Sequence, residues 1–188
     1  ARSEVARSLA VIEQCLMEAH HFKGEEIRLD YEERGLNRRA YTQYQSKGPV
    51  LAIAPYNFPL NLVMHKLAPA VIAGSPVILC PSPHTKLVTN LLVHLFSLST
   101  KRNTLLQLLH ATHEQIQFLV KAPQLKVVSF TGSAQVGWYL KSLEAKKHFI
   151  LELGGNAPVY VDQSADLNLA AKQICQGAYL YSGQICIS

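Results

Sequence analysis

The sequence has little charge of either sign and no concentrated basic surface. Charged residues make up 16% of its 188 residues, and the net charge is +5 at pH 7. Lysine and arginine are scattered, and the nearest approach to a basic run, residues 146–148, is short. Nucleic-acid binding requires clustered positive charge, so we expect no nucleic-acid partner. With 48% hydrophobic residues the chain has enough apolar material for a folded core.

Cysteine is also scarce, and its spacing fits neither a zinc site nor a small disulfide framework. No two of the cysteines form a CxxC pair; they are Cys15, Cys80, Cys175 and Cys186. This spacing predicts reduced thiols in a cytoplasmic protein. The His110 and His113 pair lacks further ligands nearby in sequence, so we predict no metal site.

Long hydrophobic runs are missing as well. The longest apolar stretch, residues 67–80, is interrupted by Pro69, Gly74 and Pro76, and it is too short to span a bilayer. No signal peptide opens the chain, so we expect no membrane partner and a cytoplasmic location. The first residue is Ala and the last residues lie inside an apparent motif, from which we expect a truncated fragment.

The order of expected elements predicts an α/β fold. Residues 2–22 have the apolar spacing of an amphipathic helix, and residues 25–47 favour a β-hairpin or extended arm that turns near Gly35. Strands are then expected at 49–54, 76–80, 104–109, 126–130, 148–151 and 158–161. Helices are expected at 60–71, 87–98, 114–120, 136–143 and 167–181. This alternation of apolar strands and helices predicts a Rossmann-like, mostly parallel sheet, which binds ligands beyond its carboxyl strand ends.

A fixed amide is expected at the end of the first of these strands. Pro55 and Pro59 flank Asn57 and restrict the backbone on both sides of it. A side-chain NH₂ held in place stabilises a developing oxyanion. The alternative interpretation is that Asn57 merely caps the helix that follows Pro59.

A glycine-bearing turn is expected after the fourth strand, in the stretch from Phe130 to Gly137. Glycine permits close backbone approach, and the free N–H groups at the start of a helix attract phosphate. Such turns are common and this one is not a G-x-G-x-x-G fingerprint, so phosphate binding competes here with a purely structural role.

A glutamate precedes two glycines at the end of the next strand, in Leu151-Glu-Leu-Gly-Gly-Asn156. Burial favours the protonated form of a carboxylate and suits it to act as a general base near neutral pH. The alternative is a surface glutamate beside a flexible turn.

The last stretch, Ser182-Gly-Gln-Ile-Cys-Ile-Ser188, places Cys186 in a loop of small residues after a helix. A cysteine in such a loop is a nucleophile if its thiolate is stabilised. A structural cysteine is the competing interpretation.

These four motifs, in this order and at these intervals, resemble the aldehyde dehydrogenase superfamily. The resemblance covers essentially the whole chain. It implies that Cys186 attacks an aldehyde, that Asn57 and the Cys186 N–H hold the oxyanion, and that Glu152 activates water to hydrolyse the thioester. It also implies NAD or NADP as cofactor and a small aldehyde as substrate. The implied cofactor residues are Ile53, Ala54, Pro55, Tyr56, Ser82, Phe130, Thr131, Gly132, Ser133, Val136 and Gly154.

The resemblance also implies a division of the chain. Residues 1–30 form an N-terminal helical segment, 31–47 an oligomerisation arm, 48–154 the NAD(P)-binding domain, and 155–188 the beginning of a catalytic domain. Family members continue through most of a catalytic domain beyond this point, so we expect little or no turnover from these residues alone. They also carry a final strand that pairs with the arm of a partner subunit, so we expect a homo-oligomer for the full-length protein.

Two departures from the family pattern concern the cofactor. Cys80 stands where the family usually has a lysine that contacts the adenosine ribose, and Pro83 replaces an acidic residue that often favours NAD. Lys86 is a possible substitute for that lysine. The turn at 110–115 lacks the usual glycine, and a side chain there would crowd the site. A catalytically weak or inactive member that serves as a binding or structural module is therefore the alternative function.

Overall fold

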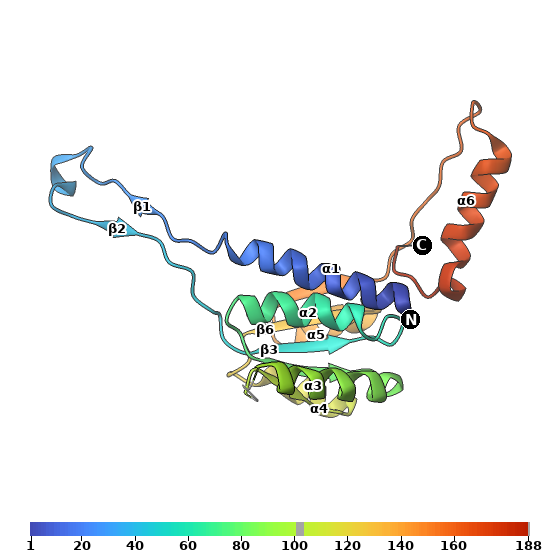
Figure 1. Ribbon diagram of the computed structural model, residues 1–188, viewed down its shortest axis with the longest axis horizontal. Coiled ribbons are helices and arrows are strands. Elements are labelled where there is room, and N and C mark those ends of the chain that lie inside the picture. Colours follow the sequence, from blue (N-terminus) through green and yellow to red (C-terminus); the bar gives the residue numbers. More distant parts are fainter. Residues whose placement is uncertain (101–103, 188) are drawn as a thin grey trace.

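The computed structural model describes residues 1–100 and 104–187, and its centre is a five-stranded parallel sheet (Figure 1). The strand order is β5-β4-β3-β6-β7, and all neighbours run parallel. The strands are β3 (Val50–Ala54), β4 (Val77–Pro81), β5 (Leu106–Leu108), β6 (Val127–Gly132) and β7 (His148–Leu153). The predicted parallel α/β sheet is confirmed, and five of the six predicted strands match these elements.

Residues along the central strand alternate between two hydrophobic cores, one on each face of the sheet. Val50, Ala52 and Ala54 belong to one core, whereas Leu51 and Ile53 belong to the other. This is the pattern of a parallel strand buried on both sides. It explains why β3 reads as a continuous apolar run rather than as an alternating one.

Helices connect the strands and cover both faces. The connecting helices are α2 (Asn61–Ile72), α3 (Lys86–Thr100), α4 (His113–Lys121) and α5 (Ala134–Leu143). Side chains of α2 and α3 pack into the first core, and those of α4 and α5 into the second. The chain therefore winds outward from β3 in one direction and then returns to β6 on its other side. The resulting switch point lies between β3 and β6, where such sheets bind ligands.

The N-terminal helix α1 (Arg2–Ala19) packs on the outer side of α2, which places it two layers from the sheet (Figure 1). The Glu4 carboxylate accepts hydrogen bonds from the backbone N–H groups of Leu60 at 2.8 Å and Asn61 at 3.1 Å. Leu60 offers α2 no side-chain cap. The start of α2 is therefore capped by a residue from another helix.

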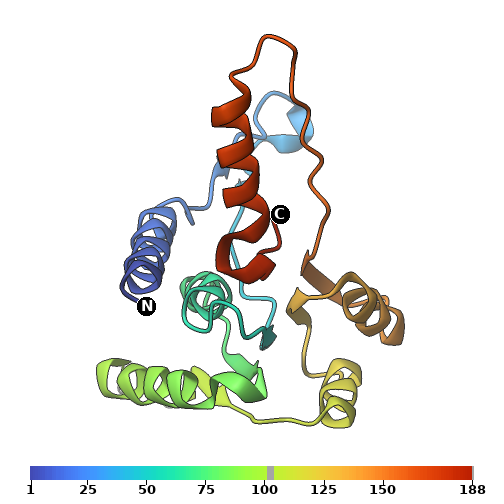
Figure 2. The same ribbon diagram turned by 90° about the vertical axis from the view of Figure 1, so that its right-hand side faces the viewer.

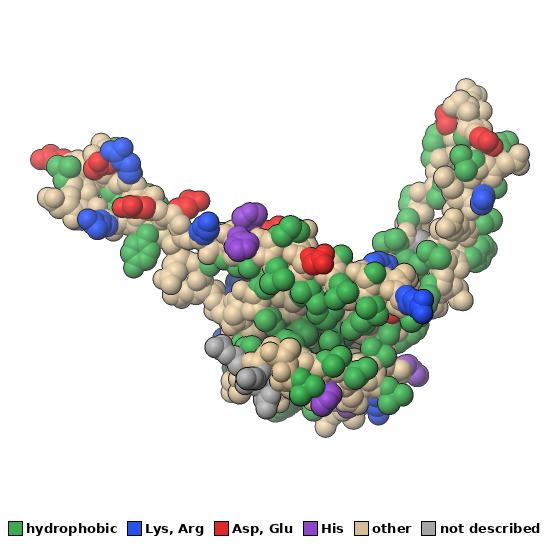
Figure 3. Space-filling model, in the orientation of Figure 1, with side chains coloured by type: hydrophobic (Ala, Val, Ile, Leu, Met, Phe, Trp, Pro, Cys, Tyr) green, Lys and Arg blue, Asp and Glu red, His purple; other side chains and the backbone are tan. Residues whose placement is uncertain are grey.

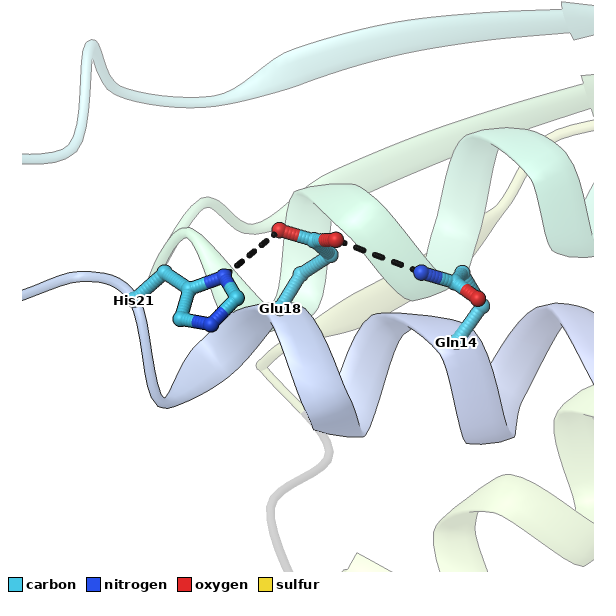
Figure 4. Close-up of polar contacts among 3 residues, drawn as sticks. All are labelled: Gln14, Glu18 and His21. Carbon is cyan, nitrogen blue, oxygen red and sulfur yellow. Dashed lines mark hydrogen bonds and ion pairs between the residues drawn. The ribbon is translucent and has the colours of Figure 1, made fainter.

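A small polar cluster lies where α1 leads into the arm. The Glu18 carboxylate accepts a hydrogen bond from Gln14 Nε2 at 3.2 Å and contacts His21 Nδ1 at 3.2 Å (Figure 4). These side chains are exposed, and exposed ion pairs contribute little to stability. The cluster marks the end of the helix and adds little to the core.

The predicted hairpin at 25–47 is confirmed as an arm that projects from the sheet domain (Figure 1). β1 (Glu26–Ile27) pairs antiparallel with β2 (Ala40–Tyr41), and η1 (Glu33–Gly35) lies between them. Figure 3 shows acidic and basic side chains gathered along this arm. Tyr31 and Tyr41 are also 79% and 75% exposed, so the arm carries apolar surface that no described residue covers.

Near the C-terminus, α6 (Leu167–Tyr179) projects away from the sheet (Figure 2), and η3 (Leu180–Gly183) follows it. The predicted strand at 158–161 is wrong, because this segment has no regular structure. No described strand pairs with it, and a strand forms only where a neighbour completes its hydrogen bonds. Val159 and Tyr160 are consequently 64% and 87% exposed.

Candidate active site

A cavity of about 650 Å³ opens beyond the carboxyl ends of the strands at the switch point. All predicted cofactor residues except Gly154 line it. Ile53, Pro55 and Tyr56 lie at or just after the end of β3, and Gly132 at the end of β6. The structure thus brings residues from distant parts of the sequence around one space. Their role in cofactor binding stays a prediction.

One wall of the cavity is the N-terminal end of α5. Ser133 is its N-cap, and its Oγ accepts one long hydrogen bond, 3.4 Å, from Val136 N. A Cβ atom built on Gly137 would lie 2.5 Å from Leu153 Cδ2, so this glycine lets α5 pack closely against β7. The free N–H groups of the first helical turn are suited to bind an anion.

The wall formed by the start of α4 carries polar side chains. Ala111, Thr112, His113 and Glu114 line the cavity, so the glycine-free turn does place side chains there. Hydrogen bonds from its own backbone N–H and from the Thr112 hydroxyl lower the pKa of Glu114. Within residues 1–100 and 104–187, no group of three or more His, Cys, Asp or Glu side chains is arranged to hold a metal ion.

The position where the resemblance leads us to expect a lysine holds a neutral thiol. Cys80 lines the cavity and is 2% exposed. Burial raises its pKa to about 11, so it remains protonated at neutral pH. Lys86, considered as a substitute, does not line the cavity. The structure therefore offers no amino group at this point of the wall.

Asn57 faces the C-terminal loop and does not cap α2. Its Nδ2 donates a hydrogen bond to the carbonyl oxygen of Gln184 at 2.7 Å, and Tyr56 Oη donates to Gln184 Oε1 at 2.5 Å. The rings of Phe58 and Tyr181 stack with centroids 5.0 Å apart. These contacts hold the cysteine-bearing loop against the end of β3. The Oδ1 atom of Asn57 accepts no hydrogen bond from the described residues, and this excludes the capping interpretation.

Cys186 follows this anchored loop and lies beside the turn after β7. Its carbonyl oxygen is 3.6 Å from a Cβ atom built on Gly155, three residues beyond Glu152. Both Cys186 and Glu152 are exposed in the described chain. The structure thus brings the Asn57, Glu152 and Cys186 segments together. Of the two interpretations of Glu152, the described chain agrees with the exposed glutamate rather than the buried one. Ser188, the last residue of the predicted loop, lies outside the described residues.

Sequence reasoning missed Lys66, a buried lysine on α2. It is 4% exposed, and its Nζ donates hydrogen bonds to Ser129 Oγ at 3.1 Å and Thr131 Oγ1 at 2.7 Å. Burial lowers its pKa to about 8, opposed by the nearby negative charge of Glu152. The available signal was a single lysine in the mostly apolar helical stretch 60–71.

Parallel strands that wind outward from a central switch point, with a ligand-sized cavity there, define a dinucleotide-binding type of α/β fold. The loop that is hydrogen-bonded to Asn57 through Gln184 also carries the exposed thiol of Cys186. Comparison with known proteins agrees with this class. The model of the aldehyde dehydrogenase family matches residues 1–188, and the chain belongs to that family.

Individual relatives match the chain over its whole length. It is 35% identical over 188 residues to a 3-sulfolactaldehyde dehydrogenase of Priestia aryabhattai, covering 100% of this chain and 39% of the relative. The structure of the NADP-dependent glyceraldehyde-3-phosphate dehydrogenase of Bacillus halodurans C-125, complexed with NADP, superposes with a TM-score of 0.90 at 32% identity. The superposition covers 98% of this chain and 39% of that one.

A second structure, an NAD-dependent aldehyde dehydrogenase from Sinorhizobium meliloti, superposes with a TM-score of 0.89 at 29% identity, covering 100% of this chain and 37% of that chain. The chain therefore spans about two fifths of the length of these relatives. Proteins of similar fold use NAD in one case and NADP in the other, so the fold alone does not select between them.

Proposed function

We propose that these residues form the cofactor-binding part and the nucleophile of an enzyme that oxidises an aldehyde to a carboxylic acid with NAD or NADP. The observation that supports this most is the hydrogen bond from Asn57 Nδ2 to the carbonyl of Gln184, two residues before Cys186. It holds the loop that carries Cys186 against the Asn57 amide, and Tyr56, which precedes Asn57, lines the cavity. The alternative, a binding module without catalysis, is favoured by Cys80 in place of an amino group.

In this proposal Cys186 is the nucleophile. Its thiolate forms a C–S bond to the aldehyde carbon, and the carbonyl electrons move to the oxygen. The Asn57 amide and the Cys186 N–H donate hydrogen bonds to that oxyanion. Asn57 must therefore exchange its present acceptor, the Gln184 carbonyl, for the substrate oxygen. Loss of hydride from the same carbon leaves a thioester on Cys186.

Glu152 completes the cycle as a general base. It removes a proton from water as the water oxygen bonds to the thioester carbon, and the C–S bond then breaks to release the acid and restore the thiolate. An ionised carboxylate is the form that accepts the proton.

The cavity suits a nicotinamide dinucleotide, which when bound accepts the hydride. Its volume lies within the range of sites for small ligands. In our proposal the start of α5, at Gly132 and Ser133, holds the pyrophosphate, and Val136 contacts the adenine. Ile53 to Tyr56 line the nicotinamide side. The substrate class is a small aldehyde, and the full-length protein is a homo-oligomer.

Acylation of the thiol tests the proposed nucleophile. An activated acetyl ester should acetylate Cys186 faster than Cys175, which is also exposed but lies on α6. Removing the amide donor by Asn57→Ala should slow the Cys186 reaction on the order of 100-fold. Asn90→Ala, on the exposed side of α3, is the matched control. Peptide mass spectrometry measures both sites, and equal rates at both cysteines would contradict the role of Cys186.

Titration of NAD and NADP by calorimetry tests the cofactor site, with Cys80→Lys beside the natural sequence. A new charged donor at the ribose contact should tighten binding by about 1.5–3 kcal/mol. Tighter binding in the variant supports a cofactor site weakened by Cys80. No binding by either protein would favour the non-catalytic alternative.

A further inference from the structure

Charge around the cavity is unevenly distributed. Glu114 is the one carboxylate that lines it, and no lysine or arginine of the described ranges does. His113, next to Glu114 in the first turn of α4, also lines the cavity. The carboxylate of Glu114 therefore gives this wall its negative charge.

The N-terminal ends of the two helices at the cavity, α4 and α5, also differ in how well they can bind an anion. At α4 a capping box closes the end: Thr112 Oγ1 accepts from Gln115 N at 3.3 Å, and Gln115 Oε1 accepts from Thr112 N at 2.8 Å. Glu114 adds a negative charge to that turn. The start of α5 has only the long Ser133 bond and no acidic residue in its first turn. One helix start is open to a phosphate and the other is not.

We propose that this cavity selects NAD over NADP and that Glu114 is the specificity-determining residue. The inference rests on the proposed function, in which the start of α5 already holds the pyrophosphate. NADP carries a further phosphate on the adenosine ribose, and that phosphate needs a cation or a free set of N–H groups. Here it meets a closed helix start and a carboxylate. The ribose hydroxyl of NAD instead donates a hydrogen bond to such a carboxylate.

Hydrogen bonds to the Glu114 carboxylate support this assignment, because they favour its ionised form. Its own backbone N–H and the Thr112 hydroxyl hold its pKa below the ordinary range. Pro83, which lines the same cavity, contributes neither charge nor donor. Selection against the phosphate therefore comes from α4 rather than from the turn after β4.

The test is calorimetric titration of NAD and NADP at pH 8 against four proteins: the natural sequence, Glu114→Gln, Glu114→Lys, and the control Glu13→Gln. Glu13 is exposed on α1, on the other side of the sheet. We expect NAD to bind on the order of tenfold more tightly than NADP to the natural sequence, as for repulsion between partly solvated charges. Glu114→Gln should narrow the ratio and Glu114→Lys should reverse it, whereas the control keeps it.

The ratio of the two affinities is the readout, so a general loss of stability does not imitate the effect. Higher ionic strength should also reduce the preference for NAD in the natural sequence. NADP binding as tightly as NAD, or a ratio that neither Glu114 variant changes, would overturn the inference while leaving the cofactor site intact. Absence of binding of both nucleotides to all four proteins would instead overturn the proposed function together with it.

Discussion

Lys66 occupies an environment that opposes its charge. It is almost fully buried, and two hydroxyl groups are its hydrogen-bond acceptors. Its pKa is about 8 in the folded chain against 10.5 for an ordinary lysine, chiefly through burial. The folded state thus binds fewer protons than the unfolded state between these two values. The resulting penalty is complete below about pH 8 and disappears as pH rises toward 10.5.

This residue therefore predicts a pH dependence of stability. Relative to Lys66→Met, the natural sequence should gain roughly 3 kcal/mol in free energy of unfolding between about pH 8 and pH 10.5. Chemical denaturation across that range measures the difference. Lys172→Met removes an exposed lysine of α6 and should show no such trend. A difference in free energy of unfolding between the natural sequence and Lys66→Met that does not change with pH would contradict the lowered pKa of Lys66.

At the scale of an element, α2 depends on α1 for its first turn. The Glu4 carboxylate supplies the acceptor for Leu60 N and Asn61 N, and Arg7 lies over the Phe58 ring at 4.8 Å. Asn57 lies in the same short connection. The N-terminal helix thus helps to position the proposed oxyanion donor, although it lies two layers from the sheet.

Removing this cap should destabilise the chain. Glu4→Ala should lower the free energy of unfolding by about 1 kcal/mol, the usual cost of a lost N-cap. Glu13→Ala makes the same change at an exposed position of α1 and controls for helix propensity. Thermal or urea unfolding measures both, and equal losses would mean that Glu4 does not cap α2.

At the scale of the whole molecule, the sheet domain carries two appendages with little core of their own. All five residues of β3 are buried, whereas α6 has no buried residue. Exposed apolar side chains occur on both the arm and the C-terminal segment, including Tyr41 and Tyr160. Among residues 1–100 and 104–187, no helix is long and apolar enough to cross a membrane.

Such surfaces predict self-association of the 188-residue chain. Exposed apolar area and unpaired strand edges favour contacts between copies. Light scattering should show species larger than a monomer at micromolar concentration, and the double variant Val159→Lys and Tyr160→Lys should reduce them. A monodisperse monomer for the natural sequence would show that neither the arm nor the C-terminal segment causes self-association.

Local patterns along the chain were sufficient to predict the parallel sheet, the connecting helices and the hairpin. Strands buried on both faces appear in the sequence as continuous apolar runs, and helices appear as apolar residues at helical spacing. The four motifs also predicted which segments meet, because the carboxyl ends of parallel strands share one edge of the sheet. For the segments of Asn57 and Cys186, the prediction came from the resemblance of the ordered motifs to the aldehyde dehydrogenase family.

Other features depend on partners that are distant in sequence. Residues 158–161 have the composition of a strand but lack a paired neighbour among the described residues, so they stay irregular. Glu152 is exposed, whereas Leu153 beside it packs against α5. The charge state of Lys66, the cap provided by Glu4 and the anionic wall at Glu114 all arise from side chains that folding brings together. Burial and hydrogen bonding are properties of the three-dimensional environment, and the type of a residue does not specify its environment.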